Sequence, residues 1–235
     1  MIEIKKGNIF TTKCHTIVNT VNTVGVMGAG IAYEFKLRFP EMFEKYKSFC
    51  DSGHIDIGNL WIYKLTKNDN EMYEYILKKK KKKDWKYPSK IEYLEKGLQK
   101  FVDTYKEKGI LSIAFPLLGA SKGGIEEDVS MKIMKKYLER VDINVEIWQF
   151  DPNAKDDLYE EFKAIFYEID DQSIKKESGI RIDIVRLIRT ALDNPKINSL
   201  SGLLNIKGVG DTSLEKIFKY IQNYKKNGSN LFTFI

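Results

Sequence analysis

The stretch from Asn19 to Lys36 constrains the fold of this chain more than any other part of its sequence. A β-branched run ends at Asn22 and passes into a loop that contains Gly25, Gly28 and Gly30, after which the residues follow the spacing of an amphipathic helix. Glycines let a backbone approach an anion closely, and the first N–H groups of a helix point toward that anion. The sequence therefore predicts a strand that delivers a phosphate-binding loop to a helix N-terminus, with the Asn22 amide in reach of a neighbouring sugar hydroxyl.

The spacing of these glycines excludes two common nucleotide-binding motifs. It is not the G-x-G-x-x-G of dinucleotide-dependent dehydrogenases, and it lacks the Gly-Lys-Ser/Thr that ends a P-loop. A second glycine-rich loop, residues 119–124, follows an apolar run that ends in Pro116-Leu-Leu. We interpret it as a second phosphate loop, and a purely structural strand-to-helix turn is the alternative.

Strand-like and helix-like runs alternate through most of the chain. The predicted strands cover residues 2–4, 16–21, 60–65, 73–77, 111–118 and 145–150. The predicted helices cover residues 29–39, 42–50, 90–105, 129–140 and 158–167. Alternation of this kind predicts an α/β fold with a mixed sheet, and ligands bind such sheets outside the carboxyl ends of the strands, where both glycine-rich loops would lie.

Four segments, in order along the chain, resemble macrodomains. Val-Asn-Thr-Val-Asn-Thr-Val-Gly-Val-Met-Gly-Ala-Gly-Ile-Ala at residues 18–32 resembles their ADP-ribose-binding loop, and Lys-Gly-Asn-Ile at 6–9 resembles the segment near the adenine. Residues 85–95 resemble the region after a catalytic lysine, and residues 113–125 resemble the second phosphate loop. The resemblance is strongest to the subgroup of DNA ADP-ribosyl glycohydrolases (DarG) and terminal ADP-ribose glycohydrolases. It implies a macrodomain-type three-layer α/β/α sandwich with a mixed sheet.

The resemblance also implies an ADP-ribose site that needs no metal or other cofactor. In it Asn8 would accept from the adenine amino group and Asn22 would orient the distal ribose for catalysis. The implied ADP-ribose-binding residues are Asn8, Ile9, Asn19, Asn22, Thr23, Val24, Gly25, Val26, Met27, Gly28, Gly30, Ile31, Leu118, Gly119, Ala120, Ser121, Lys122, Gly123 and Gly124.

Six consecutive lysines, residues 78–83, precede Asp84-Trp85, and a solvated basic loop is the ordinary interpretation of such a run. In the resembled subgroup a lysine just before this position attacks the anomeric carbon of the distal ribose. The matching residue is Lys82, with Lys81 as the alternative, because lysines replace the Phe-Pro-Thr that precedes the nucleophile in the subgroup. A lysine must lose its proton to attack, and desolvation and neighbouring cations both lower its pKa. The hypothesis therefore requires this side chain to face the cleft.

The residues after 170 differ from the rest in pattern. Residues 170–178 are polar and are expected to form a linker, and residues 181–192 are expected to form a helix that Asn194-Pro195 ends. We therefore expect two domains, residues 1–170 and a small all-α region of residues 171–235.

Residues 203–221 resemble a helix-hairpin-helix, with Gly208-Val-Gly between an apolar turn and a new helix. In that motif backbone N–H groups hold one DNA phosphate without reading bases. DNA contacts are therefore expected from Lys207, Gly208, Gly210 and Thr212. An ordinary glycine-capped turn between two helices is the alternative.

The net charge of +6 is uneven, because residues 171–235 hold eleven Lys/Arg against six Asp/Glu and residues 1–170 hold twenty-eight against twenty-seven. A basic appendage favours a polyanionic partner, and charge scattered for solubility is the alternative. Cys14 and Cys50 lack zinc-ligand spacing and indicate a reducing compartment. No apolar run is long enough to span a bilayer, so a cytoplasmic location is expected.

These features predict an ADP-ribosyl glycohydrolase, with DNA that carries ADP-ribosylated thymidine favoured as the substrate. The resemblance implies as partners ADP-ribose, ADP-ribosylated DNA and a DarT-like ADP-ribosyltransferase toxin, for which this chain would be the antitoxin. The alternatives are a non-catalytic ADP-ribose reader and a hydrolase that acts on modified protein side chains. A nuclease led by the hairpin is disfavoured, because no Asp/Glu/His metal constellation accompanies it in the sequence.

Overall fold

The computed structural model of the 235-residue chain describes residues 1–22, 24–53, 60–64, 73–78, 91–120 and 123–231. Of residues 73–78 and 226–231 it describes the backbone alone. The chain divides into two compact units, Met1–Asp151 and Pro152–Ile235, and each is described by itself.

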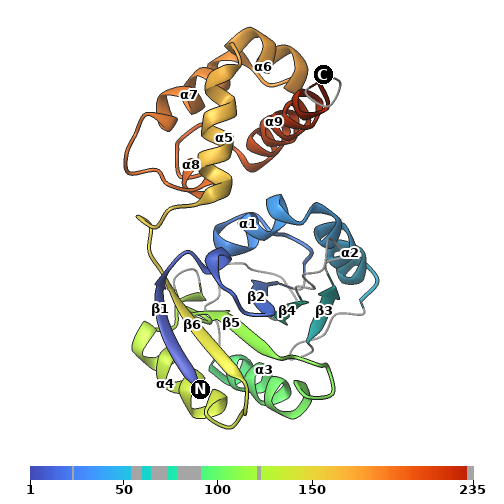
Figure 1. The fold of residues 1–235 in the computed structure, drawn as a ribbon, viewed down its shortest axis with the longest axis vertical. Coiled ribbons are helices and arrows are strands. Elements are labelled where there is room, and N and C mark those ends of the chain that lie inside the picture. Colours follow the sequence, from blue (N-terminus) through green and yellow to red (C-terminus); the bar gives the residue numbers. More distant parts are fainter. Residues whose placement is uncertain (23, 54–59, 65–72, 79–90, 121–122, 232–235) are drawn as a thin grey trace. The chain divides into compact units, whose positions relative to one another are not determined.

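Within the described residues, the first unit is built on a six-stranded sheet of order β1-β6-β5-β2-β4-β3 (Figure 1). Its strands are β1 (Ile2–Gly7), β2 (Thr16–Val21), β3 (Trp61–Lys64), β4 (Tyr73–Lys78), β5 (Ser112–Pro116) and β6 (Asn144–Phe150). Strands β3 and β4 pair antiparallel, and the other neighbours pair parallel. The sheet is therefore mixed, which confirms the prediction.

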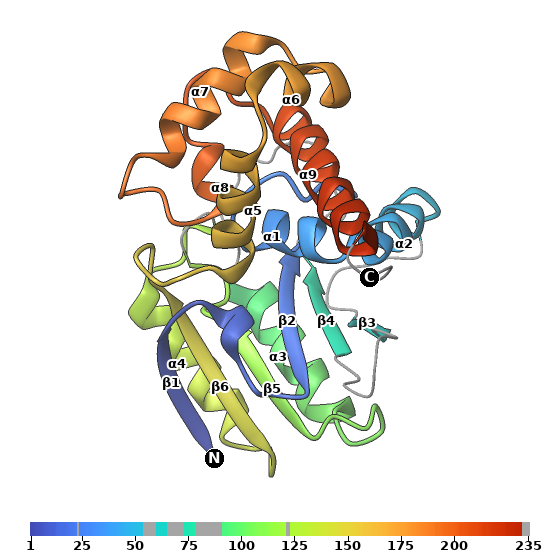
Figure 2. The same cartoon turned by 45° about the horizontal axis from the view of Figure 1, so that its top comes forward.

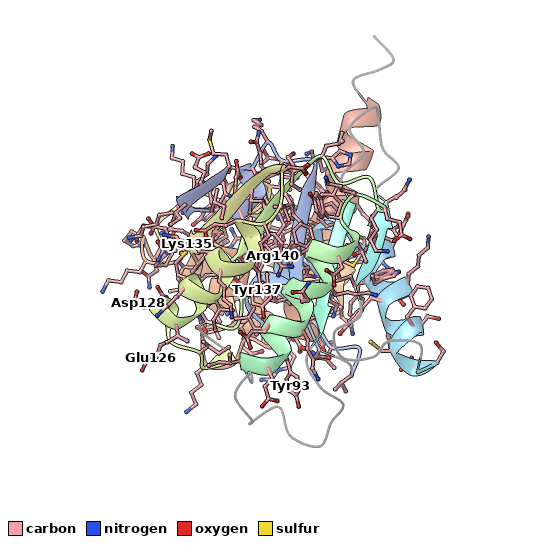
Figure 3. The ribbon with its side chains drawn as sticks, turned by 90° about the horizontal axis from the view of Figure 1, so that it is seen from below. Tyr93, Glu126, Asp128, Lys135, Tyr137 and Arg140 are labelled. Carbon is pink, nitrogen blue, oxygen red and sulfur yellow. The ribbon has the colours of Figure 1, made fainter. Side chains whose placement is uncertain are left out.

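Helices cover both faces of this sheet, with α3 and α4 behind it in Figure 2 and side by side in Figure 3. The helices of the first unit are α1 (Gly30–Arg38), α2 (Pro40–Asp51), α3 (Ile91–Thr104) and α4 (Glu127–Leu138). Along β5, Ile113 and Phe115 enter the apolar cluster that α3 and α4 cover, whereas Ala114 enters the cluster that α1 and α2 cover. Pro40 ends the first helix and begins the second. The three-layer α/β/α sandwich is confirmed.

A buried carboxylate ties β1, β6 and the segment before β2 together. Glu146, whose side chain is 10% exposed, accepts from Lys5 Nζ at 2.6 Å, Thr12 Oγ1 at 2.5 Å and Trp148 Nε1 at 2.8 Å. Burial alone would raise the pKa of this carboxyl, but the three donors outweigh burial and hold the pKa below its usual value. The network also fixes the short 3₁₀ turn η1 (Ile9–Thr11), because Thr12 follows it directly.

Glu146→Gln is expected to destabilise the first unit near neutral pH by about 2–3 kcal/mol, because Lys5 loses its closest carboxylate. A carboxyl whose pKa is lower in the folded state contributes stability above its unfolded pKa and loses it as pH falls through the folded pKa. The difference between wild type and variant should therefore be full at neutral pH and shrink below about pH 4. Urea unfolding across this range measures it, with Glu95→Gln, which breaks a surface ion pair with Lys136, as the control. A difference that did not change with pH would contradict the assignment.

The second unit is all α-helical within the described residues, as predicted for the C-terminal region. Its helices are α5 (Asp157–Glu168), α6 (Asp171–Ser178), α7 (Ile182–Leu192), α8 (Leu200–Leu203) and α9 (Asp211–Leu231). Each contributes fully buried apolar side chains: Phe162, Phe166, Ile174, Val185, Ile188, Leu192, Leu200, Leu203, Leu214, Ile217 and Ile221. Among the residues described, we find no helix with both the length and the hydrophobicity that a membrane-spanning segment requires.

This unit begins earlier than the expected boundary at residue 170. Helix α5 belongs to it, because the Phe162 ring stacks on Phe218 of α9 with centroids 6.1 Å apart. The predicted linker over residues 170–178 is wrong, because that segment forms α6. The Asp170 side chain caps this helix at its N-terminus, and Gly179, in the left-handed conformation, ends it.

When the charges are counted for the two units divided after Asp151, the net positive charge no longer lies in the C-terminal part. Residues 152–235 hold thirteen Lys/Arg against twelve Asp/Glu, and residues 1–151 hold twenty-six against twenty-one. The excess positive charge therefore lies in the first unit, since the acidic segment of α5 belongs to the second. The interpretation of the C-terminal region as a basic appendage does not hold.

Candidate functional site

The two glycine-rich loops follow neighbouring parallel strands. Thr16 of β2 pairs with Ile113 of β5, so the carboxyl ends of these strands, Val21 and Pro116, lie at the same edge of the sheet. The first loop leads into α1 and the second leads into α4. The fold thus brings both predicted loops to the edge at which ligands of such sheets bind.

The side chain of Asn22 holds the first loop in shape. Its Oδ1 accepts from the N–H of Val24 at 2.9 Å and of Val26 at 3.3 Å, and its Nδ2 donates to the Val26 carbonyl at 2.5 Å. The amide for which the resemblance implies a ribose contact is therefore engaged by the loop backbone. Thr23, inside this loop, lies outside the described residues.

Tyr46 of α2 anchors the same loop, and sequence reasoning missed it. Its hydroxyl donates to the Asn22 carbonyl at 2.5 Å and lies 3.2 Å from Asn22 Oδ1. Burial, with Cys50 nearby, raises the pKa of this phenol well above its ordinary value, so it stays protonated and remains a donor. Helical spacing places Tyr46 on the buried stripe of α2 with Met42, but nothing in the sequence indicates its partner.

The N-terminus of α1 can receive an anion. Ala29 occupies the N-cap position in an extended conformation, no described side chain caps this end, and the first turn contains no acidic residue. Gly25 and Gly30 have φ angles of +79° and +58°, which favour glycine. Met27, 1% exposed, fixes the middle of the loop in the core. Backbone N–H groups of the loop and the first turn can therefore hold a diphosphate.

The second loop is a closed turn that also depends on glycine. The Gly119 carbonyl accepts from the Ile125 N–H at 3.0 Å, and the Ala120 carbonyl accepts from the Gly123 N–H at 3.0 Å. Gly119 and Gly124 both have φ of +74°. Two further predicted residues of this loop lie outside the described residues: Ser121 and Lys122.

Gly119→Ala is expected to weaken ADP-ribose binding about tenfold, because a Cβ there would lie 2.6 Å from Cδ1 of the buried Ile125 side chain, so that this side chain or the loop would have to shift. Gly109→Ala is the matched control, since Gly109 has φ of +68° but a Cβ there meets nothing within 4 Å. Both variants carry the cost of a left-handed backbone, and only the first should change affinity. Calorimetric titration with ADP-ribose measures this, and equal losses in the two variants would refute it.

Besides Met27, three more of the predicted binding residues lie in the core. Ile9 is 6% exposed, Leu118 is 2% exposed and Asn19 is fully buried, with its Nδ2 3.8 Å from Met27 Sδ. Asn19 therefore supports the first loop from beneath. The periodicity of a strand buried on both faces is the feature that could have placed Asn19 inside.

Asn8 directly follows Gly7, the last residue of β1. Its Oδ1 accepts from the Phe10 N–H at 3.0 Å and so caps η1. Gly7 pairs with Phe150, which is 68% exposed, whereas Trp148 is 8% exposed and fills the core. The adenine contact of Asn8 stays a prediction.

The six-lysine run begins beside the first loop. The backbone of Lys78, the last residue of β4, pairs with Val21 of β2, directly before Asn22. Lys81 and Lys82 lie outside the described residues. Three or four residues of chain span at most about 10–14 Å, which limits their distance from the end of β4.

In the second unit a glycine turn joins α8 to α9, as predicted. Gly208 has φ of +100°, and Val209 is 6% exposed and packs inward. Asp211 Oδ1 accepts from the Thr212 N–H at 2.7 Å, so a carboxylate already engages one N–H group expected to bind phosphate. The predicted DNA-contacting residues are exposed: Lys207, Gly208, Gly210 and Thr212.

Comparisons with known proteins place this geometry in context. The family model described as Macro domain matches residues 18–134. The DNA ADP-ribosyl glycohydrolase of Thermus aquaticus is 36% identical over 152 residues, which are 65% of this chain and 41% of that protein. The chain thus spans about two fifths of the length of the curated relatives of this kind.

Solved structures similar to this chain include proteins of the same kind. The macrodomain of Mycobacterium tuberculosis DarG matches with a TM-score of 0.57 and 32% identity, over 63% of this chain and 97% of that chain. Thermosipho africanus DarTG in complex with ADP-ribose matches with a TM-score of 0.58 and 30% identity, over 63% of this chain and 41% of that chain.

Proposed function

Because the chain belongs to the macrodomain family, we propose that its first unit binds ADP-ribose and removes it from ADP-ribosylated DNA, with thymidine as the modified nucleoside. One observation carries the proposal: the two glycine-rich loops and the start of the lysine run lie at one edge of the sheet. At that edge the loops would bind the diphosphate, and a lysine of the run would supply the amine nucleophile.

In the proposed reaction the loop backbones hold the diphosphate, and Asn22 holds the first loop in the shape that this requires. The Lys82 amine attacks the anomeric carbon as the bond from that carbon to the base breaks. The amine gives up a proton, the base leaves with one, and water then releases ADP-ribose from the lysine. Binding energy from the adenosine and diphosphate keeps the anomeric carbon against the amine.

The names of the relatives support this choice of substrate and partner. The Thermus aquaticus relative is a DNA ADP-ribosyl glycohydrolase, and the Thermosipho africanus relative is a fusion of a DNA ADP-ribosyl transferase with such a glycohydrolase. We extend the glycohydrolase function to this chain and propose that it is a cytoplasmic antitoxin that reverses the action of a DarT-like transferase.

The test presents the protein with a single-stranded oligonucleotide that carries ADP-ribosyl thymidine and, separately, with ADP-ribosylated protein. We expect free ADP-ribose to be released from the oligonucleotide alone. Binding of ADP-ribose without release from either substrate would assign the reader function instead. Release from protein alone would move the substrate to protein side chains, and no binding at all would remove the proposal.

As part of the same function, the hairpin before α9 would hold a DNA phosphate through Lys207, Gly208, Gly210 and Thr212. A bound phosphate would have to displace the Asp211 carboxylate from the Thr212 N–H. Asp211→Asn is therefore expected to raise the affinity for DNA at low salt, and Lys207→Gln to lower it. Fluorescence anisotropy with a labelled oligonucleotide measures both, and unchanged affinity in both variants would leave the hairpin an ordinary turn.

A further inference from the structure

A strip of aromatic and basic side chains runs along α2 and β3. Lys45 and Phe49 lie one turn apart on α2, and Trp61 and Tyr63 lie two residues apart on β3, so each pair shares one face of its element. Lys45 Nζ lies 5.0 Å from the Tyr63 ring centroid, and the Phe49 and Trp61 centroids lie 5.5 Å apart, edge to face. The Trp61 and Tyr63 centroids are 5.8 Å apart. These four residues form the α2–β3 strip.

The strip lies at the surface of the first unit. Lys45 and Phe49 are exposed, and Trp61 and Tyr63 are half-buried against the apolar cluster beneath α1 and α2. The rings are thus held in place from below while part of the strip stays open to water. Rigid aromatic rings interleaved with cations bind unpaired nucleic acid, because every base offers a face for stacking and every nucleotide offers a phosphate.

The helix that carries this strip also holds the first loop. Tyr46, next to Lys45 in the sequence, donates to the Asn22 carbonyl. A Cβ built on Gly25 would lie 3.4 Å from Cys50 Cβ, so the loop packs directly against the end of α2 that carries Phe49. The strip therefore starts where the loop meets the helix.

Strand pairing sets the direction of the strip relative to the proposed active site. Trp61 pairs with Ile76 of β4, two residues before Lys78, and Lys78 pairs with Val21 at the start of the first loop. The end of the strip with Phe49 and Trp61 is therefore nearer to the loop, and the end with Lys45 and Tyr63 is farther from it. A strand that leaves the active site would meet Phe49 and Trp61 first and Lys45 with Tyr63 afterwards.

We propose that the α2–β3 strip binds the single-stranded DNA that flanks the modified nucleotide. This inference rests on the proposed function and deepens it by naming the surface along which the substrate strand runs. The first unit carries the excess positive charge that such a partner requires. Helix α2 also holds three exposed acidic residues (Glu41, Glu44 and Asp51), so the pairing of lysine with rings, and not the net charge of the helix, selects the strip.

The opposite face of the sheet offers a matched control. On α4, Lys136 Nζ lies 5.3 Å from the centroid of the Tyr137 ring, so this pair has the same chemistry as Lys45 and Tyr63. Figure 3 shows Tyr137 on the face formed by α3 and α4, with Glu126 and Asp128 near the start of α4. This pair lies away from both ends of the strip, because α4 covers the other face of the sheet.

The experiment compares the double variant Lys45→Gln/Phe49→Ala with the control Lys136→Gln/Tyr137→Ala, after thermal melting has shown that both are folded. Each is given an ADP-ribosylated single-stranded oligonucleotide and the ADP-ribosylated thymidine nucleoside. We expect the strip variant to raise KM for the oligonucleotide about 5- to 30-fold, with kcat and the KM for the nucleoside unchanged. The control variant should behave as wild type on both substrates.

An unchanged KM for the oligonucleotide, or equal rises for both substrates, would overturn the inference. Should the wild type release ADP-ribose from neither substrate, the proposed function fails, and anisotropy with unmodified labelled single strands still tests the strip. Equal affinity of wild type and strip variant for that probe would overturn the inference, as would equal competition by duplex DNA, whose bases cannot stack on the rings. Lys45→Gln alone, at an exposed position, should give a smaller change in the same direction if the double variant does not fold.

Discussion

Lys82→Ala is expected to slow the release of ADP-ribose by at least about 10³-fold and to leave the affinity for ADP-ribose within about twofold of wild type. In the proposed reaction the amine takes part only in the chemical step, and the loop backbones would supply most of the binding energy for the diphosphate. The fold supports this choice to the extent that β4 ends at Lys78 beside Val21, so the run that contains Lys82 leaves the sheet next to the first loop. Single-turnover release measures the rate, and calorimetry measures the affinity.

Lys81→Ala and Lys80→Ala are the matched controls, because each removes one charge from the same run and leaves the other five lysines in place. Both should retain most of the activity. Loss of activity in the Lys81 variant alone would shift the nucleophile by one residue. A modest and equal loss in all three variants would mean that the run acts only through its charge. Mass spectrometry of acid-quenched protein should find ADP-ribose attached to the peptide that contains the nucleophile.

The elements of the first unit could be predicted because their signals are local. β2 has the predicted bounds, since its β-branched run ends where Asn22 begins the loop. The turn at Gly25 and Gly30 requires positive φ angles that glycine supplies most readily, and the sequence shows this directly. Secondary structure and loop type therefore followed from neighbours along the chain.

The division between the two units could not be predicted. The apolar face of a helix shows that the helix packs against something, but it does not show which unit that is. α5 has the spacing of an amphipathic helix, and that spacing would suit either unit; it is assigned by contacts across the chain, such as the stacking of Phe162 on Phe218 and the ion pair of Glu161 with Lys225. The helix over residues 171–178 was missed for a different reason. The polar composition of this segment favours a linker, whereas the N-cap at Asp170 and the left-handed Gly179 favour a helix between them. Ile174 is the buried residue of that helix.

At the candidate site, too, the sequence did not show which residues contact one another. The loops were identified from sequence, but Ile9, Asn19 and Leu118 are buried supports, and the sequence does not distinguish a residue that lines a pocket from one beneath it. Contacts between residues far apart in the sequence could not be predicted either. Glu146 meets Lys5 across 141 positions, and Tyr46 meets Asn22 across 24.

Asn22→Ala is expected to weaken the binding of both ADP-ribose and ADP, each by about 10- to 100-fold. The substitution removes the one oxygen that accepts from the N–H groups of Val24 and Val26 and the amide that donates to the Val26 carbonyl, so the loop loses the side chain that holds it. If Asn22 acts as a brace that holds the loop in shape, it affects the diphosphate that both ligands share. The ratio of the affinity for ADP-ribose to the affinity for ADP should therefore stay at its wild-type value. Tyr46→Phe, which removes the hydroxyl that holds the Asn22 carbonyl, should produce a smaller loss with the same ratio.

Asn194→Ala is the matched control, because Asn194 accepts from the Lys196 N–H in a similar turn of the second unit and should not change either affinity. Calorimetric titrations of the variants with ADP and with ADP-ribose give the two ratios. A loss confined to ADP-ribose would assign Asn22 a direct contact with the distal ribose, because ADP lacks that sugar, and would contradict the role as a brace. Asn22→Asp then separates the two functions of the amide, because it keeps the acceptor for Val24 and Val26 but places a second oxygen against the Val26 carbonyl. That repulsion should open the loop and weaken both ligands equally if the brace is what matters.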